Sequence, residues 1–247
     1  MKKYMMLVCL MLVASVCSAA TLEIAPEISH ISYREKNLSV GQRDAITVKE
    51  DGVFYGLHGI IENRDRVYLA ADGRVAFGTV EYSGTGEIPE IQDRLYEVRG
   101  LVGYPFKYLV LFTGYGYRYL NDDGEGKVTS TGLFAYERES TYQYVPIGIK
   151  VDYWKIPFQA EIDVLITGEQ RSNLHHLDPF LPEVINKQNR GAGFKISTNF
   201  KKSFKHFDLV LTPFVRGWKI QDSKTDDWFY EPKNTSLEVG GALGIRF

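Results

Sequence analysis

The residues of this chain best suited to acid–base or metal chemistry lie together in one polar stretch. His175 and His176 are adjacent, and Asp178 follows two positions later. A histidine beside a carboxylate is a pairing that hydrolases use to activate water. Two adjacent histidines rarely converge on one metal ion, and no third histidine or cysteine stands nearby to complete a zinc site. The sequence therefore favours a solvated polar loop here and predicts no metal or cofactor site.

A larger set of charged residues recurs at alternate positions within segments that are otherwise rich in apolar residues. Its central members are Glu97, Arg99, Arg118, Glu161, Arg216, Glu238 and Arg246. If the fold encloses these side chains, they must pair, because an unpaired buried charge is costly. If they line a water-filled channel, they set its selectivity. The elements that carry them decide between a polar network and a channel lining.

Those elements are predicted to be β-strands almost throughout. In the last segment, 237–247, apolar side chains alternate with small or charged ones, and 109–119 and 158–166 repeat the pattern. A period of two is typical of a strand with two different faces. Further candidates are 22–34, 45–63, 65–83, 92–104, 141–153, 190–200 and 205–221. The prediction is an all-β chain, a closed antiparallel up-and-down transmembrane β-barrel of about ten strands, with eight as the alternative.

The connections between these strands alternate in length. The short ones lie near 63–65, 104–106, 154–156 and 201–204. The longer, polar ones are 34–44, 84–91, 121–140, 168–190 and 222–233. Short turns at one end and long loops at the other are typical of an outer-membrane barrel.

Alternation alone does not say which face points inward, and a soluble barrel with an apolar interior is the alternative. The polar faces are rich in glycine, which suits a narrow interior. The apolar faces carry aromatic residues near their ends, as bilayer girdles do; these are Tyr55, Tyr96, Tyr104, Tyr119, Tyr153 and Phe200. We therefore expect the charged set inside. A ten-strand barrel leaves little space beside long charged side chains, which favours a network over a channel lining.

The final strand, which ends in Phe247, resembles the C-terminal signal of Gram-negative outer-membrane β-barrel proteins. The run 116–123, followed by 136–140 and 144–148, is similar to segments of small barrels in the OmpA-like outer-membrane superfamily. The resemblance implies a porin-like fold in outer-membrane lipid, with Phe247 as the assembly signal. It also implies the barrel-assembly machinery as a partner during biogenesis, and it specifies no chemistry.

A ten-strand barrel with acids and a histidine at its outer rim also resembles the omptin proteases. That resemblance implies two activating pairs, His176 with Asp178 and Asp122 with Asp123, although the first pair runs in the reverse order to the family's. The sequence contains no Gly-x-Ser-x-Gly elbow, HExxH helix or phosphate-binding loop. No catalytic residue is assigned.

Residues 1–20 are predicted to be a signal peptide and 21–247 the outer-membrane β-barrel domain. Lys2 and Lys3 precede the short apolar stretch 5–16, and 18–20 supply the small residues of a cleavage site. Both cysteines of the chain lie within 1–20. We therefore expect export through a cleaved signal to the bacterial outer membrane, without disulfides.

The predicted function follows from this location. The formal charge of -2, from 29 basic and 31 acidic residues, gives no basic footprint for nucleic acid. The loop residues Trp228, Phe229 and Tyr230 form either an adhesive patch or, as we favour, a cap over the barrel mouth. We expect a largely plugged barrel with a structural, adhesive or surface-interaction role and no enzyme activity. The alternatives are a narrow passive pore and a rim-located hydrolase, either omptin-like or lipid-modifying.

Overall fold

The computed structural model describes residues 20–37, 46–152, 157–175, 177, 183–223 and 230–247. The predicted signal peptide lies almost entirely outside these residues and stays a prediction. The strands are β1 (Thr21–Asn37), β2 (Ile46–Asn63), β3 (Tyr68–Ser83), β4 (Glu87–Pro105), β5 (Leu109–Asp123), β6 (Glu137–Val151), β7 (Phe158–Asn173), β8 (Val184–Lys187), β9 (Gly191–Thr198), β10 (Phe200–Ser203), β11 (Asp208–Ile220) and β12 (Asn234–Arg246). No helix in the described part of the chain is long and apolar enough to cross a membrane.

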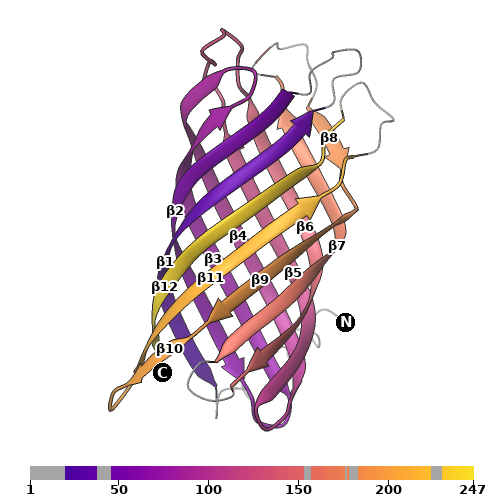
Figure 1. Cartoon of the computed structure of the whole chain (residues 1–247). Helices are drawn as coiled ribbons and strands as arrows, with labels where there is room; N and C mark the ends of the chain where they lie inside the picture. The colour runs from indigo at the N-terminus through magenta and orange to yellow at the C-terminus, as the bar shows by residue number, and fades with distance from the viewer. Residues whose placement is uncertain (1–19, 38–45, 153–156, 176, 178–182, 224–229) are drawn as a thin grey trace, which may run out of the picture.

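The strands close into one antiparallel barrel (Figure 1). The long strands β1 to β7 pair in chain order, β11 pairs with β12, and β12 pairs with β1. Three short strands share one place in the wall, because β8 pairs with β7, β9 pairs with both β7 and β11, and β10 pairs with β11. The wall therefore has ten strands, as the alternation predicted.

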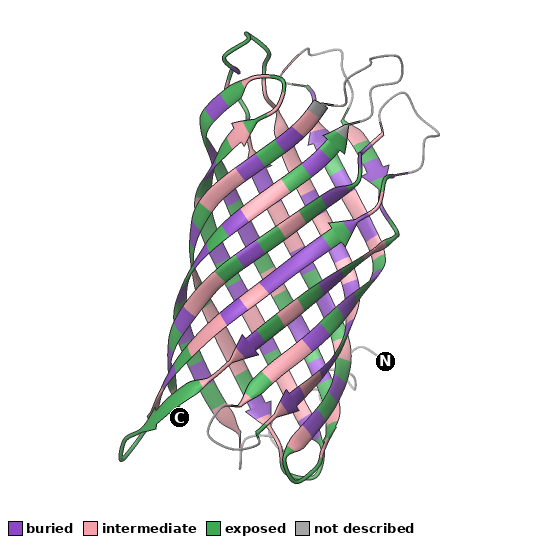
Figure 2. Cartoon of the chain, in the orientation of Figure 1, coloured by how far each residue is buried: buried purple, intermediate pink, exposed green. Residues whose placement is uncertain are grey.

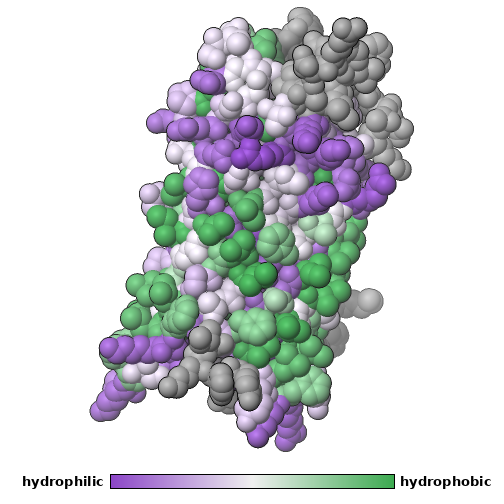
Figure 3. Space-filling model, viewed as in Figure 1, coloured by the Kyte–Doolittle hydropathy of each residue, from purple (hydrophilic) through white to green (hydrophobic). Residues whose placement is uncertain are grey.

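Side chains alternate between a buried and an exposed face along every long strand (Figure 2). The exposed face is apolar over the lower part of the barrel, and the hydrophilic side chains gather in a band above it (Figure 3). Exposed residues of the apolar belt include Ile147 and Ile162, at 56% and 59%. Aromatic rings edge the belt, with Phe77, Tyr96 and Tyr119 in a row whose neighbouring centroids are 6.1 Å apart. The outward face is therefore the lipid-facing one, as predicted.

Small inward residues make room for large ones on the neighbouring strand. A Cβ atom added to Gly116 of β5 would lie 2.2 Å from the ring of Tyr144 on β6, which is fully buried. Any larger side chain at Gly116 would displace that ring. The glycine-rich inner face that the sequence showed is thus a packing requirement of a narrow lumen.

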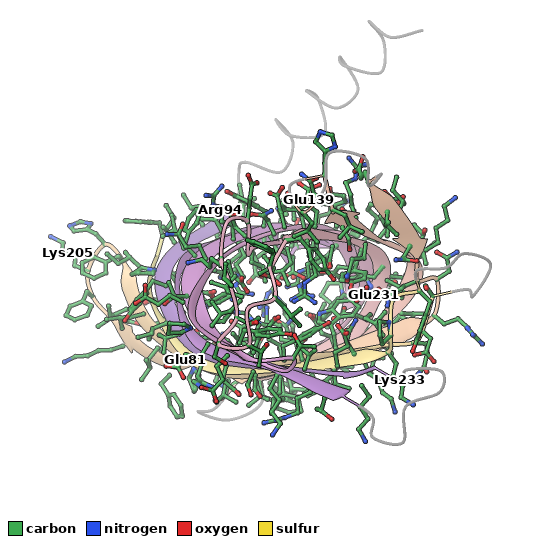
Figure 4. The ribbon with its side chains drawn as sticks, turned by 90° about the horizontal axis from the view of Figure 1, so that it is seen from above. Glu81, Arg94, Glu139, Lys205, Glu231 and Lys233 are labelled. Atoms are coloured by element: carbon green, nitrogen blue, oxygen red, sulfur yellow. The ribbon has the colours of Figure 1, made fainter. Side chains whose placement is uncertain are left out.

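The strands run further toward the loop end than the alternation predicted. The predicted loop 84–91 is only the turn 84–86, and 121–140 shrinks to 124–136. The reason is that outward residues above the belt are polar, such as Arg94 and Glu139 (Figure 4), so apolar alternation stops while backbone pairing continues. Hydrophobic periodicity reports the membrane belt and not the whole strand.

The assignment of faces can be tested with an arginine at the belt's middle. Ile162 is the central member of the outward row that begins at Phe158 and ends at Ile166. We expect Ile162→Arg to lower the free energy of unfolding in lipid vesicles by roughly 2–4 kcal/mol, because the charge enters hydrocarbon. Gln92→Arg, exposed above the belt, is the matched control and should change it by less than about 1 kcal/mol. If Ile162→Arg left the free energy of unfolding unchanged, the assignment of the inner and outer faces would be wrong.

Candidate functional site

Buried ion pairs that cross the lumen are the most distinctive feature of the interior. The first group joins Arg74 and Arg216 to Glu27 and Glu238. Arg216 donates to Glu238 at 2.8 Å and to Glu27 at 3.0 Å, and Arg74 contacts the same two carboxylates. Ser29 donates a further hydrogen bond to Glu238. Arg74 lies on β3 and Glu238 on β12, with β1 and β2 between them in the wall, so the pair spans the interior.

A second group lies around Arg99 on β4. Its guanidinium donates to Asp72 at 2.7 Å and to Glu161 on β7, on the other side of β5 and β6. His58 Nε2 lies 3.3 Å from the Asp72 carboxylate. Arg99, Asp72 and Glu161 are all less than 7% exposed. Paired carboxylates on opposite walls thus hold one arginine across the lumen.

The end of the barrel with the short turns is tied in the same way. Lys150 on β6 donates to Glu62 on β2 at 2.6 Å, across the width of three intervening strands. Arg246 donates to Glu23 at 2.6 Å, which joins the last strand to the first. Lys150 and Glu62 thus connect two strands that are not neighbours in the wall, whereas Arg246 and Glu23 join two paired strands. Side chains fill the ring when it is viewed along the axis (Figure 4).

An aromatic layer lies beside these groups. Tyr142, Tyr144 and Trp218 pack together, with Trp218 at 5.0 Å from Tyr144 and 6.1 Å from Tyr142 between ring centroids. The Tyr144 hydroxyl donates to Glu97. Arg118, which faces Glu97 in the strand register, lies over the Trp218 ring at 5.8 Å.

The structure places the sequence-derived set on the inner face, although two of its members, Glu97 and Arg118, lack the ion pairs that burial was expected to require. Glu97 and Arg118 make no ion pair with one another, and no described carboxylate lies within ion-pair distance of Arg118. The Tyr144 hydroxyl donates to Glu97, while Arg118 lies over the indole of Trp218 and its positive charge still acts on Glu97. The spacing of Glu97 and Arg118 in the sequence predicted their depth in the barrel but not the side chains that they contact.

A further cluster near the loop end escaped the sequence reasoning. Arg138 on β6 donates to Asp122 at 2.8 Å and to Glu35 at 3.4 Å, and it also contacts Glu50. These carboxylates come from β5, β1 and β2, so Arg138 reaches across the mouth of the barrel. The sequence placed 121–140 in a loop, which removed Asp122 and Arg138 from the interior set. Arg138, Ser140 and Tyr142 occupy alternate positions on one face of β6, and this period of two was the signal that could have placed Arg138 inside the barrel.

The remaining candidates lie apart from these clusters. Asp122 and Asp123 are neighbours on a strand, so Asp122 points inward while Asp123 lies 3.8 Å from the exposed Arg94. They do not form a carboxylate pair. His175 is exposed, and His176, Asp178, Trp228 and Phe229 lie outside the described residues. Among the described residues, no group of three or more histidine, cysteine or acidic side chains is arranged to hold a metal ion.

Solved structures of other proteins share this architecture. The outer membrane protease OmpT of Escherichia coli matches with a TM-score of 0.57 at 11% identity, over 93% of this chain and 96% of that one. The chain is an outer-membrane-type β-barrel. Weaker matches are the β-domain of the Bordetella autotransporter BrkA (TM-score 0.38, 12% identity, 91% and 98% covered) and the Escherichia coli outer membrane phospholipase A (0.29, 11%, 87% and 89%). No family model and no curated protein matches the chain.

A shared fold does not choose an activity, because one fold hosts many functions. At 11% identity, the likeness to OmpT concerns the path of the backbone alone. The choice between roles therefore rests on the side chains of this barrel.

The lumen pairs predict unequal effects for two arginines. Arg99→Ala leaves Asp72 and Glu161 buried without their cation and should destabilise the barrel by roughly 3–5 kcal/mol. Arg118→Ala loses the contact with Trp218 and strands no ion-paired acid, so its cost should be about 1–2 kcal/mol. Folding titrations in lipid vesicles measure both. Equal losses would contradict the partner assignment.

Glu231, which lies in the segment before β12, predicts a pH effect. Burial, and then the negative charge of Glu35, raise the pKa of Glu231 to about 8, while Arg138 opposes the shift. The pKa of a glutamate in an unfolded chain is about 4.3. Between that pH and the folded-state pKa, Glu231 therefore holds a proton in the folded state that the unfolded chain has lost. Stability should fall as the pH rises through this window. Glu231→Gln, compared with wild type at about pH 5 and about pH 9, should flatten that fall.

Proposed function

We propose that this chain is a small outer-membrane barrel of the OmpA-like superfamily that acts through its extracellular end and does not conduct. On this proposal it is exported by its signal peptide, assembled through the signal ending in Phe247, and embedded in outer-membrane lipid. The loop end then faces outward, since both described termini lie at the end with the short turns (Figure 1). Its role is structural or adhesive, without enzyme activity or nucleic acid partners.

The observation that carries this proposal is the set of ion pairs that span the lumen. They occur at successive depths, from Lys150 with Glu62, through Arg99 with Glu161, to Arg138 with Glu35. Each joins strands that are not neighbours in the wall. A solute would have to break every level in turn, and breaking a buried pair costs several kcal/mol. The interior is built to hold the walls together and not to pass solutes.

The location is tested by fractionation. The mature chain should appear with the outer membrane, and it should migrate faster on gels when unheated than when boiled, because a closed barrel resists detergent. Loss of the terminal aromatic in Phe247→Ala should reduce the folded fraction in cells while purified protein still folds in vesicles. Recovery of wild type as a soluble periplasmic protein would refute the proposed location.

The closed lumen is tested by conductance in planar bilayers. Wild type should show no steady current, and the double variant Arg99→Ser with Glu161→Ser should also stay silent, because the ion pairs at the other depths remain in place. Asp72 keeps its contact with His58 in this variant. The pair Arg94→Ser with Asp123→Ser, on the exposed face, is the matched control and should stay silent. A steady wild-type current would favour the passive pore instead.

A further inference from the structure

A cavity of about 200 Å³ lies at the loop end, between the upper parts of the first strands and the 124–136 segment. One side of it is acidic and is formed by Glu35, Glu50 and Asp122. The other side is apolar and includes Ile88, Ile91 and Phe134. We call this cavity the mouth chamber. It is polar on one wall and apolar on the other, which is the arrangement that orients a small ligand.

The 124–136 segment is fixed in place over the β3–β4 turn. The Ser130 amide donates to the Glu87 carbonyl at 3.0 Å, and the Glu87 amide donates back to the Ser130 hydroxyl at the same distance. The Thr131 hydroxyl donates to the Thr85 carbonyl at 2.6 Å. The mouth chamber is therefore formed before any ligand arrives, and a ligand does not have to order this segment.

The chamber and its floor hold more carboxyl groups than cationic groups. Arg138 is shared by Glu35, Glu50 and Asp122. Directly across from Asp122 in the strand register lies Asp93, which is 4% exposed, lines a separate neighbouring cavity, and has an Oδ1 atom without a hydrogen-bond partner among the described residues. The second carboxylate oxygen of Asp122, Oδ1, is likewise buried and without a partner there.

These unpaired acceptors indicate a missing donor of positive charge. A buried carboxylate oxygen without a donor is costly, and a charge-assisted hydrogen bond is the strongest way to satisfy it. The described acids are not arranged to hold a metal ion, and the lining also includes the apolar side chains of Ile88, Ile91 and Phe134. Both facts point to an organic cation with an apolar body.

We propose that the mouth chamber binds a small amphipathic amine, with its ammonium group against Asp122 and Glu50 and its apolar body against Ile88, Ile91 and Phe134. A cavity of about 150 Å³ accommodates benzene, so the chamber fits one six-membered ring with a short amine-bearing chain. The inference rests on the proposed function only in that the loop end is the surface that meets external ligands.

The experiment uses full-length folded protein in detergent micelles and three isosteric probes. Isothermal titration should show saturable binding of 2-phenylethylamine, and no binding of 2-phenylethanol or 3-phenylpropionate at matched concentrations. Asp122→Asn and Glu50→Gln should each weaken amine binding by about tenfold or more, because each removes one of the two carboxyl groups that would contact the ammonium. Glu81→Gln, on the exposed face, is the matched control and should bind as wild type does.

Phe134→Ala provides a second variant that does not touch the ion pairs. Phe134 is 66% exposed, so its truncation should leave the barrel folded while weakening amine binding several-fold. Equal binding of the alcohol, unchanged binding in Asp122→Asn and Glu50→Gln, or no binding of the amine would overturn the inference. If wild type shows no conductance and does not bind the amine, only this inference is refuted. If wild type conducts and binds the amine, only the proposal of a closed lumen is refuted.

Discussion

The structure depends on how a narrow closed barrel satisfies the charges that its inner face encloses. The central arginines, Arg74, Arg99 and Arg216, each contact two carboxylates, and in every case at least one of the two comes from a strand that is not a neighbour. A guanidinium suits this task because its donors fan out in one plane and it remains charged. The arrangement couples strands that the backbone hydrogen bonds leave independent, so the ring resists flattening as well as opening.

The same constraint explains the distribution of residue size inside. Long charged side chains fill most of the lumen of this ten-strand barrel. An aromatic ring fits into the remaining space where the paired residue on the neighbouring strand is small. Gly116 opposite Tyr144 is such a place. Tyr144 in turn donates to Glu97, so the packing of a ring and the satisfaction of a buried carboxylate depend on one another. An interior of this kind is specified by shape and by hydrogen bonding together.

Much of the fold follows from the sequence because a membrane barrel imposes two solvents on the two faces of each strand. The ten wall strands and their facing were predictable wherever lipid lies outside, as along 158–166. Above the belt the outer face meets water, so apolar residues no longer alternate with polar ones. The sequence pattern therefore predicts loops where the upper parts of β5 and β6 lie. Partners were less predictable than depth, since they depend on strand stagger and on side-chain reach. Arg118 lies at the expected depth, yet it contacts the ring of Trp218 and no acid.

The balance of charge also differs along the axis, and the difference has a physical cause. In the middle of the barrel, Arg74, Arg99 and Arg216 pair with four carboxylates, whereas Asp163 Oδ1 is buried there without a partner among the described residues. At the mouth, a single guanidinium on Arg138 faces Glu35, Glu50 and Asp122, with Asp93 below and Glu231 beside Glu35. An excess of acid is tolerable there because external water can deliver protons, and the raised pKa of Glu231 is the sign of that solution. A cationic ligand would replace those protons with one charge-assisted contact. The mouth has one cation for several acids, so this is the end of the lumen where a bound cation gains the most free energy.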